Sequence, residues 1–119
     1  MPHIVLDRRI DLFNFSELFT PIFQKSPLIK IPTIYVEKSG SIAILPTIVI
    51  DDKHQEYFIQ IMTNDKKTTI RLLPQTDPEK TDAVKLSLAK VYAQMKNHYP
   101  DIVITKSNLF DYVKMCELA

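Results

Sequence analysis

Hydrophobic and polar positions in the first third of the chain predict a strand, a helix and a connector. The β-branched run "HIVLD" is typical of a short strand. In "NFSELFTPIFQK" the apolar side chains recur one helical turn apart, which predicts a helix with Asn14 as its N-cap. The prolines of "SPLIKIPTIYVEKSGS" argue against a continued helix, so we expect a connector there.

The middle of the chain predicts two strands. The apolar run "IAILPTIVID" contains Pro46, which indicates a sheet edge or a bulge because proline has no N–H to donate to a ladder. A second β-rich run, "EYFIQIMT", follows after the turn "DDKHQ". This spacing favours an antiparallel pair.

The last third predicts the clearest helix of the chain. The stretch "KTDAVKLSLAKVYAQMKNHY" carries a broad apolar stripe, and Thr76 or Asp77 is the expected cap. We interpret its Met and Tyr side chains as core packing. After Pro100, "DIVIT" predicts a final strand, and the tail "NLFDYVKMCEL" is amphipathic enough for a short helix or a strand.

The order of these elements is strand, helix, strand, repeated once. It predicts an α/β (α+β) fold of two βαβ units, which form a four-stranded sheet with both helices on one face. On this interpretation residues 1–119 are a single domain, with pseudo-repeat halves of about 1–55 and 56–119. The other sheet face would be apolar and bare, so we expect the chain to self-associate.

Composition excludes several classes of function. Lys+Arg 15 against Asp+Glu 14 leaves a net charge of +1, which gives no basic field for nucleic acid. With Gly40 as the sole glycine, no glycine-rich phosphate loop can form, and with Cys116 as the sole cysteine and scattered histidines no metal site is expected. We therefore expect no cofactor and no metal. The chain shows no signal-peptide pattern and no apolar run long enough for a bilayer, which favours a cytoplasmic protein without a membrane partner.

Pro2 is the candidate for chemistry because it directly follows the initiator methionine. Removal of Met1 would leave Pro2 with a free secondary amine, which can act as a base or a nucleophile. The alternative is that Pro2 merely begins a strand, a position where proline loses no ladder donor. An α-amino group has a pKa of about 7.7–8.0, and an apolar, partly cationic site would lower it toward neutrality, where a base transfers protons best.

Three stretches, "MPHIV", "EYFIQIMT" and "PQTDPEK", resemble the tautomerase superfamily, and most closely its 5-carboxymethyl-2-hydroxymuconate isomerase group. Together with the element order, the resemblance covers nearly the whole chain. It implies a homotrimer of paired βαβ units whose sheets enclose a barrel-like core. It also implies a cofactor-independent isomerase that uses Pro2 as general base on a small enolisable carbonyl compound.

The sequence departs from this superfamily where a substrate carboxylate would bind. An arginine is expected just before the second helix, but this chain has Gln75, which lacks a charged fork. A second arginine is expected after the first crossover, at "SGSIAIL", where only Lys38 is close. The cations that could substitute are Arg8 and Arg9 after the first strand, and Lys66, Lys67 and Arg71 around the loop "NDKKTTIR". We take Gln75, Arg71, Lys38 and Lys67 as candidate substrate-binding residues, and we expect a monoacid or neutral enol rather than a dicarboxylate.

Two classes of function remain open at this point. One is the tautomerase with Pro2 as its base. The other is a catalytically impaired trimer of the same fold that acts as a small-molecule binding or structural module, because a fold does not determine a function.

Overall fold

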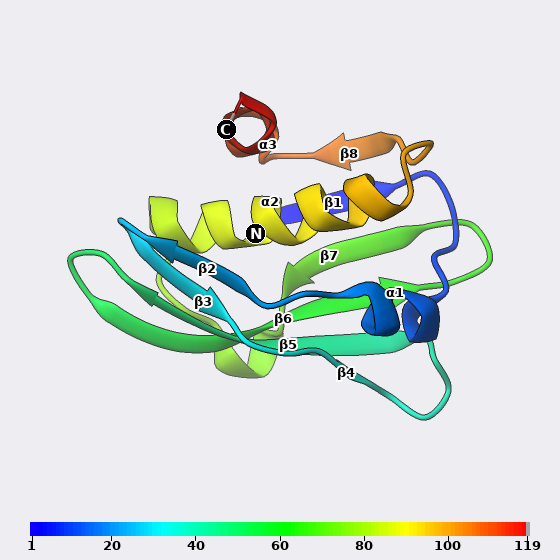
Figure 1. Ribbon diagram of the computed structural model, residues 1–119, viewed down its shortest axis with the longest axis horizontal. Helices are drawn as coiled ribbons and strands as arrows, with labels where there is room; N and C mark the ends of the chain where they lie inside the picture. The colour runs from blue at the N-terminus through cyan, green and yellow to red at the C-terminus, as the bar shows by residue number, and fades with distance from the viewer. Residues whose placement is uncertain (119) are drawn as a thin grey trace.

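The computed structural model describes residues 1–118, and its dominant feature is an antiparallel sheet curled around one long helix (Figure 1). The chain order is β1 (His3–Leu6), α1 (Leu12–Leu18), β2 (Ile22–Lys25), β3 (Leu28–Ile31), β4 (Tyr35–Val36), β5 (Ile42–Ile50), β6 (His54–Thr63), β7 (Thr68–Leu72), the 3₁₀ turn η1 (Pro74–Thr76), α2 (Asp82–His98), β8 (Ile104–Ser107) and α3 (Phe110–Leu118).

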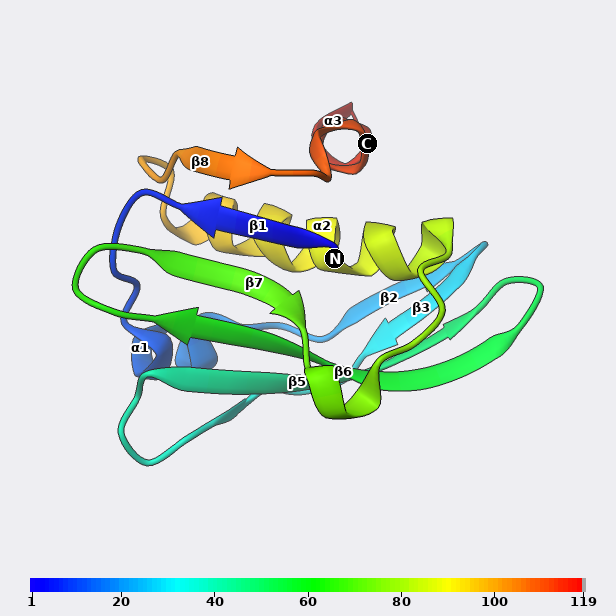
Figure 2. The same cartoon turned by 180° about the vertical axis from the view of Figure 1, so that it is seen from behind.

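In the described part of the chain the sheet has eight strands, seven of them in the order β2-β3-β5-β6-β7-β1-β8, and β4 pairs with the same edge of β5 as β3 does. Every strand pair is antiparallel. Strands β5, β6 and β7 follow one another as hairpins, whereas β1 comes from the start of the chain and lies between β7 and β8. The first and last strands of the chain therefore meet in the same part of the sheet (Figure 2).

Alternation of side chains along β5 and β6 gives the sheet one face toward α2 and one face away from it. On β5, Leu45 and Val49 are fully buried, whereas Ile44, Pro46 and Ile48 between and beside them are half-buried. On β6, Tyr57 reaches α2, where its hydroxyl lies 2.5 Å from the Ser87 hydroxyl. The side chains between these positions point to the opposite face, which we call the outer face.

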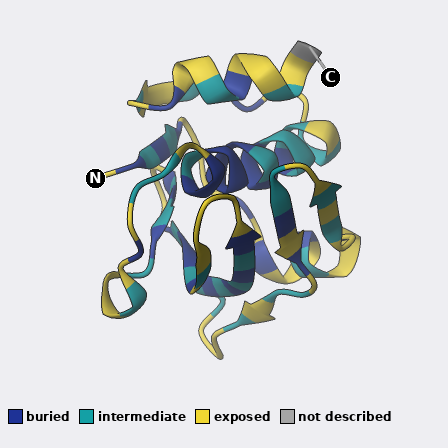
Figure 3. Ribbon diagram, turned by 90° about the vertical axis from the view of Figure 1, so that its left-hand side faces the viewer, coloured by how far each residue is buried: buried dark blue, intermediate teal, exposed yellow. Residues whose placement is uncertain are grey.

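Helix α2 supplies the core on the inner side of the curl. It begins after Thr81, whose side chain accepts a hydrogen bond from the Val84 N–H. Its apolar stripe is buried against the sheet, and the prediction that Tyr92 and Met95 pack in the core is confirmed. Helix α3 packs on α2 and exposes its own outer side (Figure 3). None of the helices among residues 1–118 is both long and apolar enough to cross a membrane.

The predicted fold of two βαβ units with a four-stranded sheet and two helices on one face is wrong. Within the described residues 1–118 the sheet has eight strands, all pairs are antiparallel, and there are three α-helices. The physical reason is that β2, β3, β4 and β7 were not recognised as strands, so β1 and β5, and likewise β6 and β8, were each interpreted as consecutive strands joined through a helix. The expected boundary between halves 1–55 and 56–119 falls inside β6. The tautomerase-like architecture implied by the resemblance is thus not that of this chain.

Two predicted helix boundaries also need correction. Helix α1 ends at Leu18, and Ile22–Lys25 form β2 instead of its continuation. Its cap is Asp11, whose carboxylate accepts a hydrogen bond from the backbone N–H of Asn14. The second helix begins after Thr81, because Pro74–Thr76 form η1.

Candidate functional site

Pro2 directly precedes β1 and is buried. The carbonyl oxygen of Met1 lies 2.9 Å from Asn108 Nδ2 and 2.8 Å from His3 Nδ1, and both nitrogens can donate to it. The His3 backbone N–H donates to Asn108 Oδ1 at 3.1 Å. The Met1–Pro2 peptide is thus tied to the junction between β8 and α3. In this peptide the proline nitrogen is an amide without a basic lone pair, so catalysis by Pro2 stays a prediction that requires removal of Met1.

The four candidate substrate-binding residues lie in different parts of the sheet. Arg71 lies on β7, directly opposite His3 of β1. Gln75 lies in η1, which follows β7. Lys67 lies in the turn from β6 to β7, roughly 13 Å from Arg71 along an extended chain. Lys38 lies in the turn from β4 to β5. Of these, Arg71 is the residue on a strand next to β1.

The outer face of the sheet is largely apolar at its centre. Its half-buried apolar side chains come from two neighbouring strands: Ile42, Ile44, Pro46 and Ile48 of β5, and Phe58 and Met62 of β6. The longest helix, α2, lies on the other side of the sheet (Figure 2). An apolar strip of this kind is typical of an interaction surface rather than of a surface that faces water.

A polar row crosses this apolar surface. In register across the sheet, Ile44 of β5 lies opposite Gln60 of β6, Gln60 lies opposite Arg71 of β7, and Arg71 lies opposite His3 of β1. Gln60 is only 8% exposed, and its Oε1 accepts a hydrogen bond from Arg71 Nε at 2.8 Å. This contact orients the guanidinium through Nε. Within residues 1–118, no carboxylate forms an ion pair with Arg71.

An acidic group lies on the same face, on the far side of Phe58. Glu56 is two positions before Phe58 on β6, whereas Gln60 is two positions after it. The Glu56 side chain is 68% exposed and lies 3.3 Å from His54 Nε2. A hollow of about 190 Å³ lies beside it, with a lining that includes Pro46, Ile48, Phe58, Pro32 and Thr76. The outer face therefore carries an acid and a base on opposite sides of an apolar centre.

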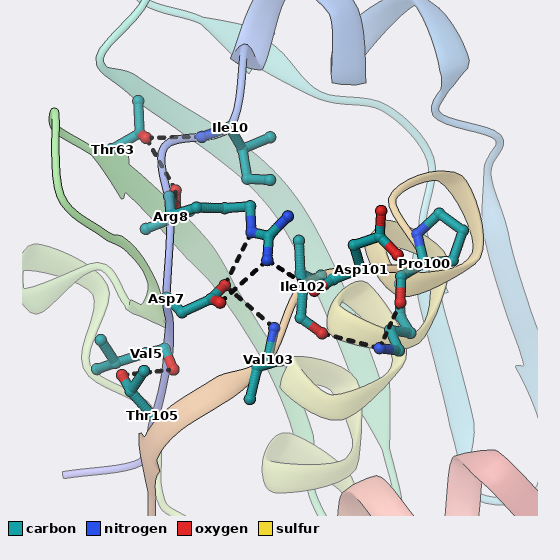
Figure 4. A network of polar contacts seen from close by, with 12 residues as sticks. Val5, Asp7, Arg8, Ile10, Thr63, Pro100, Asp101, Ile102, Val103 and Thr105 are labelled. Carbon is teal, nitrogen blue, oxygen red and sulfur yellow. Dashed lines mark hydrogen bonds and ion pairs between the residues drawn. The ribbon is translucent and has the colours of Figure 1, made fainter.

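A second polar cluster, at the end of β1, has its charges satisfied internally (Figure 4). Arg8 donates to both oxygens of the Asp7 carboxylate, at 3.0 and 3.1 Å, and also to the carbonyl of Asp101 at 2.8 Å. The Val103 N–H donates to Asp7 Oδ1 at 3.1 Å. The Arg8 side chain, followed by the Val103 N–H, holds the pKa of Asp7 below its usual value. This cluster fastens β1 to the segment before β8, so we interpret it as structural.

Neither the single cysteine nor the potential metal ligands of the described residues form a reactive site. Burial raises the pKa of the Cys116 thiol, which disfavours the reactive thiolate. No group of three or more His, Cys, Asp or Glu side chains within residues 1–118 is placed to hold a metal ion.

Comparisons of the chain with protein-family profiles, with curated proteins and with solved structures found no match. The function therefore has to be argued from the geometry of the chain.

Sequence reasoning identified the strand "EYFIQIMT" but assigned no role to Glu56, Phe58 or Gln60. The apolar character of both alternating sets of positions in β5 did predict a bare apolar face, but it did not indicate which polar residues of β6 and β7 lie on that face. The contact between Gln60 and Arg71 depends on the register of β6 with β7, and no local pattern reports that register.

Proposed function

We propose that this chain is a self-assembling structural module whose outer sheet face binds the same face of a second copy. The observation that supports this most is the combination, on that face, of an apolar strip with an oriented arginine that has no carboxylate partner among the described residues. Burial of the strip against another apolar surface is favourable at roughly 25 cal/mol per Å². The arginine then requires an acid from the partner, since an unpaired buried charge is costly.

The size of the face fits a dimer of moderate strength. The central strands β3, β5, β6 and β7 have 4, 9, 10 and 5 residues. At about 3.3 Å per residue and about 4.8 Å between strands, they cover roughly 440 Å² per copy. Stable interfaces bury about 800 Å² per partner, so we expect a dissociation constant in the micromolar range. The curl around α2 makes the outer face convex (Figure 1). Because two convex faces touch mainly at their centres, we expect the contact to be confined to the central strands β5, β6 and β7 of each copy.

Sedimentation velocity at protein concentrations of about 1 to 300 μM tests the proposal. We expect the wild-type chain to shift from monomer to dimer over this range. Ile44→Glu places a charge in the apolar strip and should remain monomeric. Met115→Glu is the matched control, because Met115 is 54% exposed on α3, away from the outer face, and this variant should behave as wild type. A wild-type chain that remains monomeric throughout would overturn the proposal.

A further inference from the structure

The outward side chains at the centre of the sheet form three parallel rows. On β6 they are Glu56, Phe58 and Gln60, and their partners on β5 are Ile48, Pro46 and Ile44, respectively. Arg71 of β7 extends the row of Gln60. The middle row is apolar on both strands. The row on one side of it ends in an acid, and the row on the other side ends in a base.

This arrangement is self-complementary under one particular symmetry. When two faces pack on each other, a twofold axis between them lies in the interface plane, so each residue faces the residue on the other side of that axis. With the axis along the row of Phe58 and Pro46, these two side chains meet their own counterparts. Ile44 of one copy then faces Ile48 of the other, and Gln60 of one copy faces Glu56 of the other. Arg71 lies next to Gln60, one strand or about 4.8 Å farther along the same row, within reach of that carboxylate.

We infer that the chain forms a twofold dimer through its outer face, in which Arg71 of each copy pairs with Glu56 of the other. This inference rests on the proposed function and assigns a geometry to it. Because Gln60 engages Arg71 through Nε, the terminal nitrogens of the guanidinium are left for the incoming carboxylate. The 190 Å³ hollow beside Ile48 and Phe58 gives room to an apolar side chain of the second copy.

The charges on the outer face favour a twofold axis along the middle row over one that runs parallel to the strands. A twofold axis running along β6, parallel to the strands, would place Glu56 against Glu56. Like charges that face each other across an interface are unfavourable and suppress the wrong arrangement. The axis along the middle row instead forms two symmetric pairs of opposite charge, one at each side of the apolar centre.

A charge exchange tests the geometry. Arg71→Glu would place two acids together at each contact, and Glu56→Arg would place two bases together, so each single variant should dimerise at least tenfold more weakly than wild type. When the two single variants are mixed, each contact of the mixed dimer contains one acid and one base. The mixture should therefore form a heterodimer, and the double variant Arg71→Glu/Glu56→Arg should again form a homodimer.

The measurement is sedimentation with fluorescence detection, in which one single variant is labelled and the other is added unlabelled. Lys106→Glu on β8 is the matched control, because Lys106 is an exposed cation outside the three rows, and this variant should dimerise as wild type. Circular dichroism establishes that each variant is folded. Added salt should weaken the wild-type dimer, since the pairs lie near the rim of the apolar strip.

The outcomes separate this inference from the proposed function. A wild-type chain that is monomeric overturns both. A wild-type dimer that Ile44→Glu disrupts, but whose single charge variants dimerise normally or whose mixture stays monomeric, overturns the twofold geometry and leaves the self-association through the outer face in place. Loss of dimer in both single variants, with recovery in the mixture and in the double variant, supports the inference.

Discussion

At the scale of single residues, Pro2 is where the enzyme hypothesis and the structural module differ most. The structural module predicts that the chain does not accelerate the keto–enol conversion of a monoacid such as a phenylpyruvate-like compound, and that Pro2→Ala changes nothing. Ultraviolet absorbance of the enol measures the rate, and mass spectrometry reports whether Met1 is present. A wild-type rate well above buffer, reduced on the order of 10²-fold by Pro2→Ala and abolished by an extra residue before Pro2, would restore the tautomerase.

The contribution of the buried Tyr57 to the stability of the fold depends on pH. The residue is 2% exposed, and its hydroxyl lies against that of Ser87. Burial raises the pKa of this hydroxyl well above the ordinary value of about 10. Because the folded state keeps the proton longer than the unfolded state, the stability that this group contributes is complete below about pH 10 and is lost as pH rises above that value.

We therefore predict that Tyr57→Phe lowers the free energy of unfolding by about 1 kcal/mol at pH 7, where one hydrogen bond is lost. Ser87 keeps its bond to the Val84 carbonyl at 2.6 Å, which limits the loss. Above about pH 10 the wild type should lose stability faster than Tyr57→Phe, so the gap narrows. Urea unfolding measured between about pH 7 and 11 follows both trends, and a constant gap at high pH would contradict the assignment.

At the scale of elements, the contact of α1 with the turn before β5 depends on Gly40. Its φ is +79°, and a Cβ built there would lie 2.6 Å from Phe13 Cε2 of α1. Gly40→Ala therefore imposes both an unfavourable backbone conformation and a clash, and should lower the free energy of unfolding by about 1–3 kcal/mol. In a Phe13→Ala background the clash disappears, so the same substitution should cost measurably less. Equal costs in the two backgrounds would show that backbone strain alone is responsible.

The elements that sequence reasoning identified are those with a strong pattern of their own. The hairpin of β5 and β6 and the helix α2 were predicted because long apolar runs and a sustained helical period mark them. The tail also forms a helix, α3, which was one of its two predicted forms. The packing of these elements against one another was not predictable in the same way, because it depends on which strands lie between them.

Four strands were missed, namely β2, β3, the two-residue β4, and β7. In β2 half-buried side chains alternate with exposed ones, and in β3 the buried Ile29 and Ile31 flank the exposed Lys30. This is the pattern of short strands that bury one face only. The apolar positions of β2 also matched the helical spacing that continues from α1. Strand β7 follows a turn in which Asn64 Oδ1 accepts hydrogen bonds from the backbone N–H groups of Lys66 and Lys67, an Asx-type turn signal.

Of the strands that were not predicted, β7 affected the expected topology most. Strand β1 pairs with β7 and β8, so without β7 its nearest partners in the expected topology were parallel strands. Arg71 was named as a candidate binding residue from its charge. Its neighbours are His3 of β1, which is distant in sequence, and Gln60 of β6. Only the register of the curled sheet brings these three residues together.

At the scale of the whole molecule, self-association makes stability depend on protein concentration, because a dimer forms only from folded chains. For a dissociation constant of about 10 μM, a rise in total concentration from about 1 to 100 μM should stabilise the folded chain by roughly 0.9 kcal/mol, because the free monomer is depleted as dimer forms. At this chain length that corresponds to a rise in Tm of about 4 °C. Ile44→Glu should have a Tm that does not change with concentration, whereas Met115→Glu should follow the wild type. Differential scanning fluorimetry across the dilution series measures this, and a wild-type Tm that is flat while the dimer is present would mean that association does not involve the folded outer face.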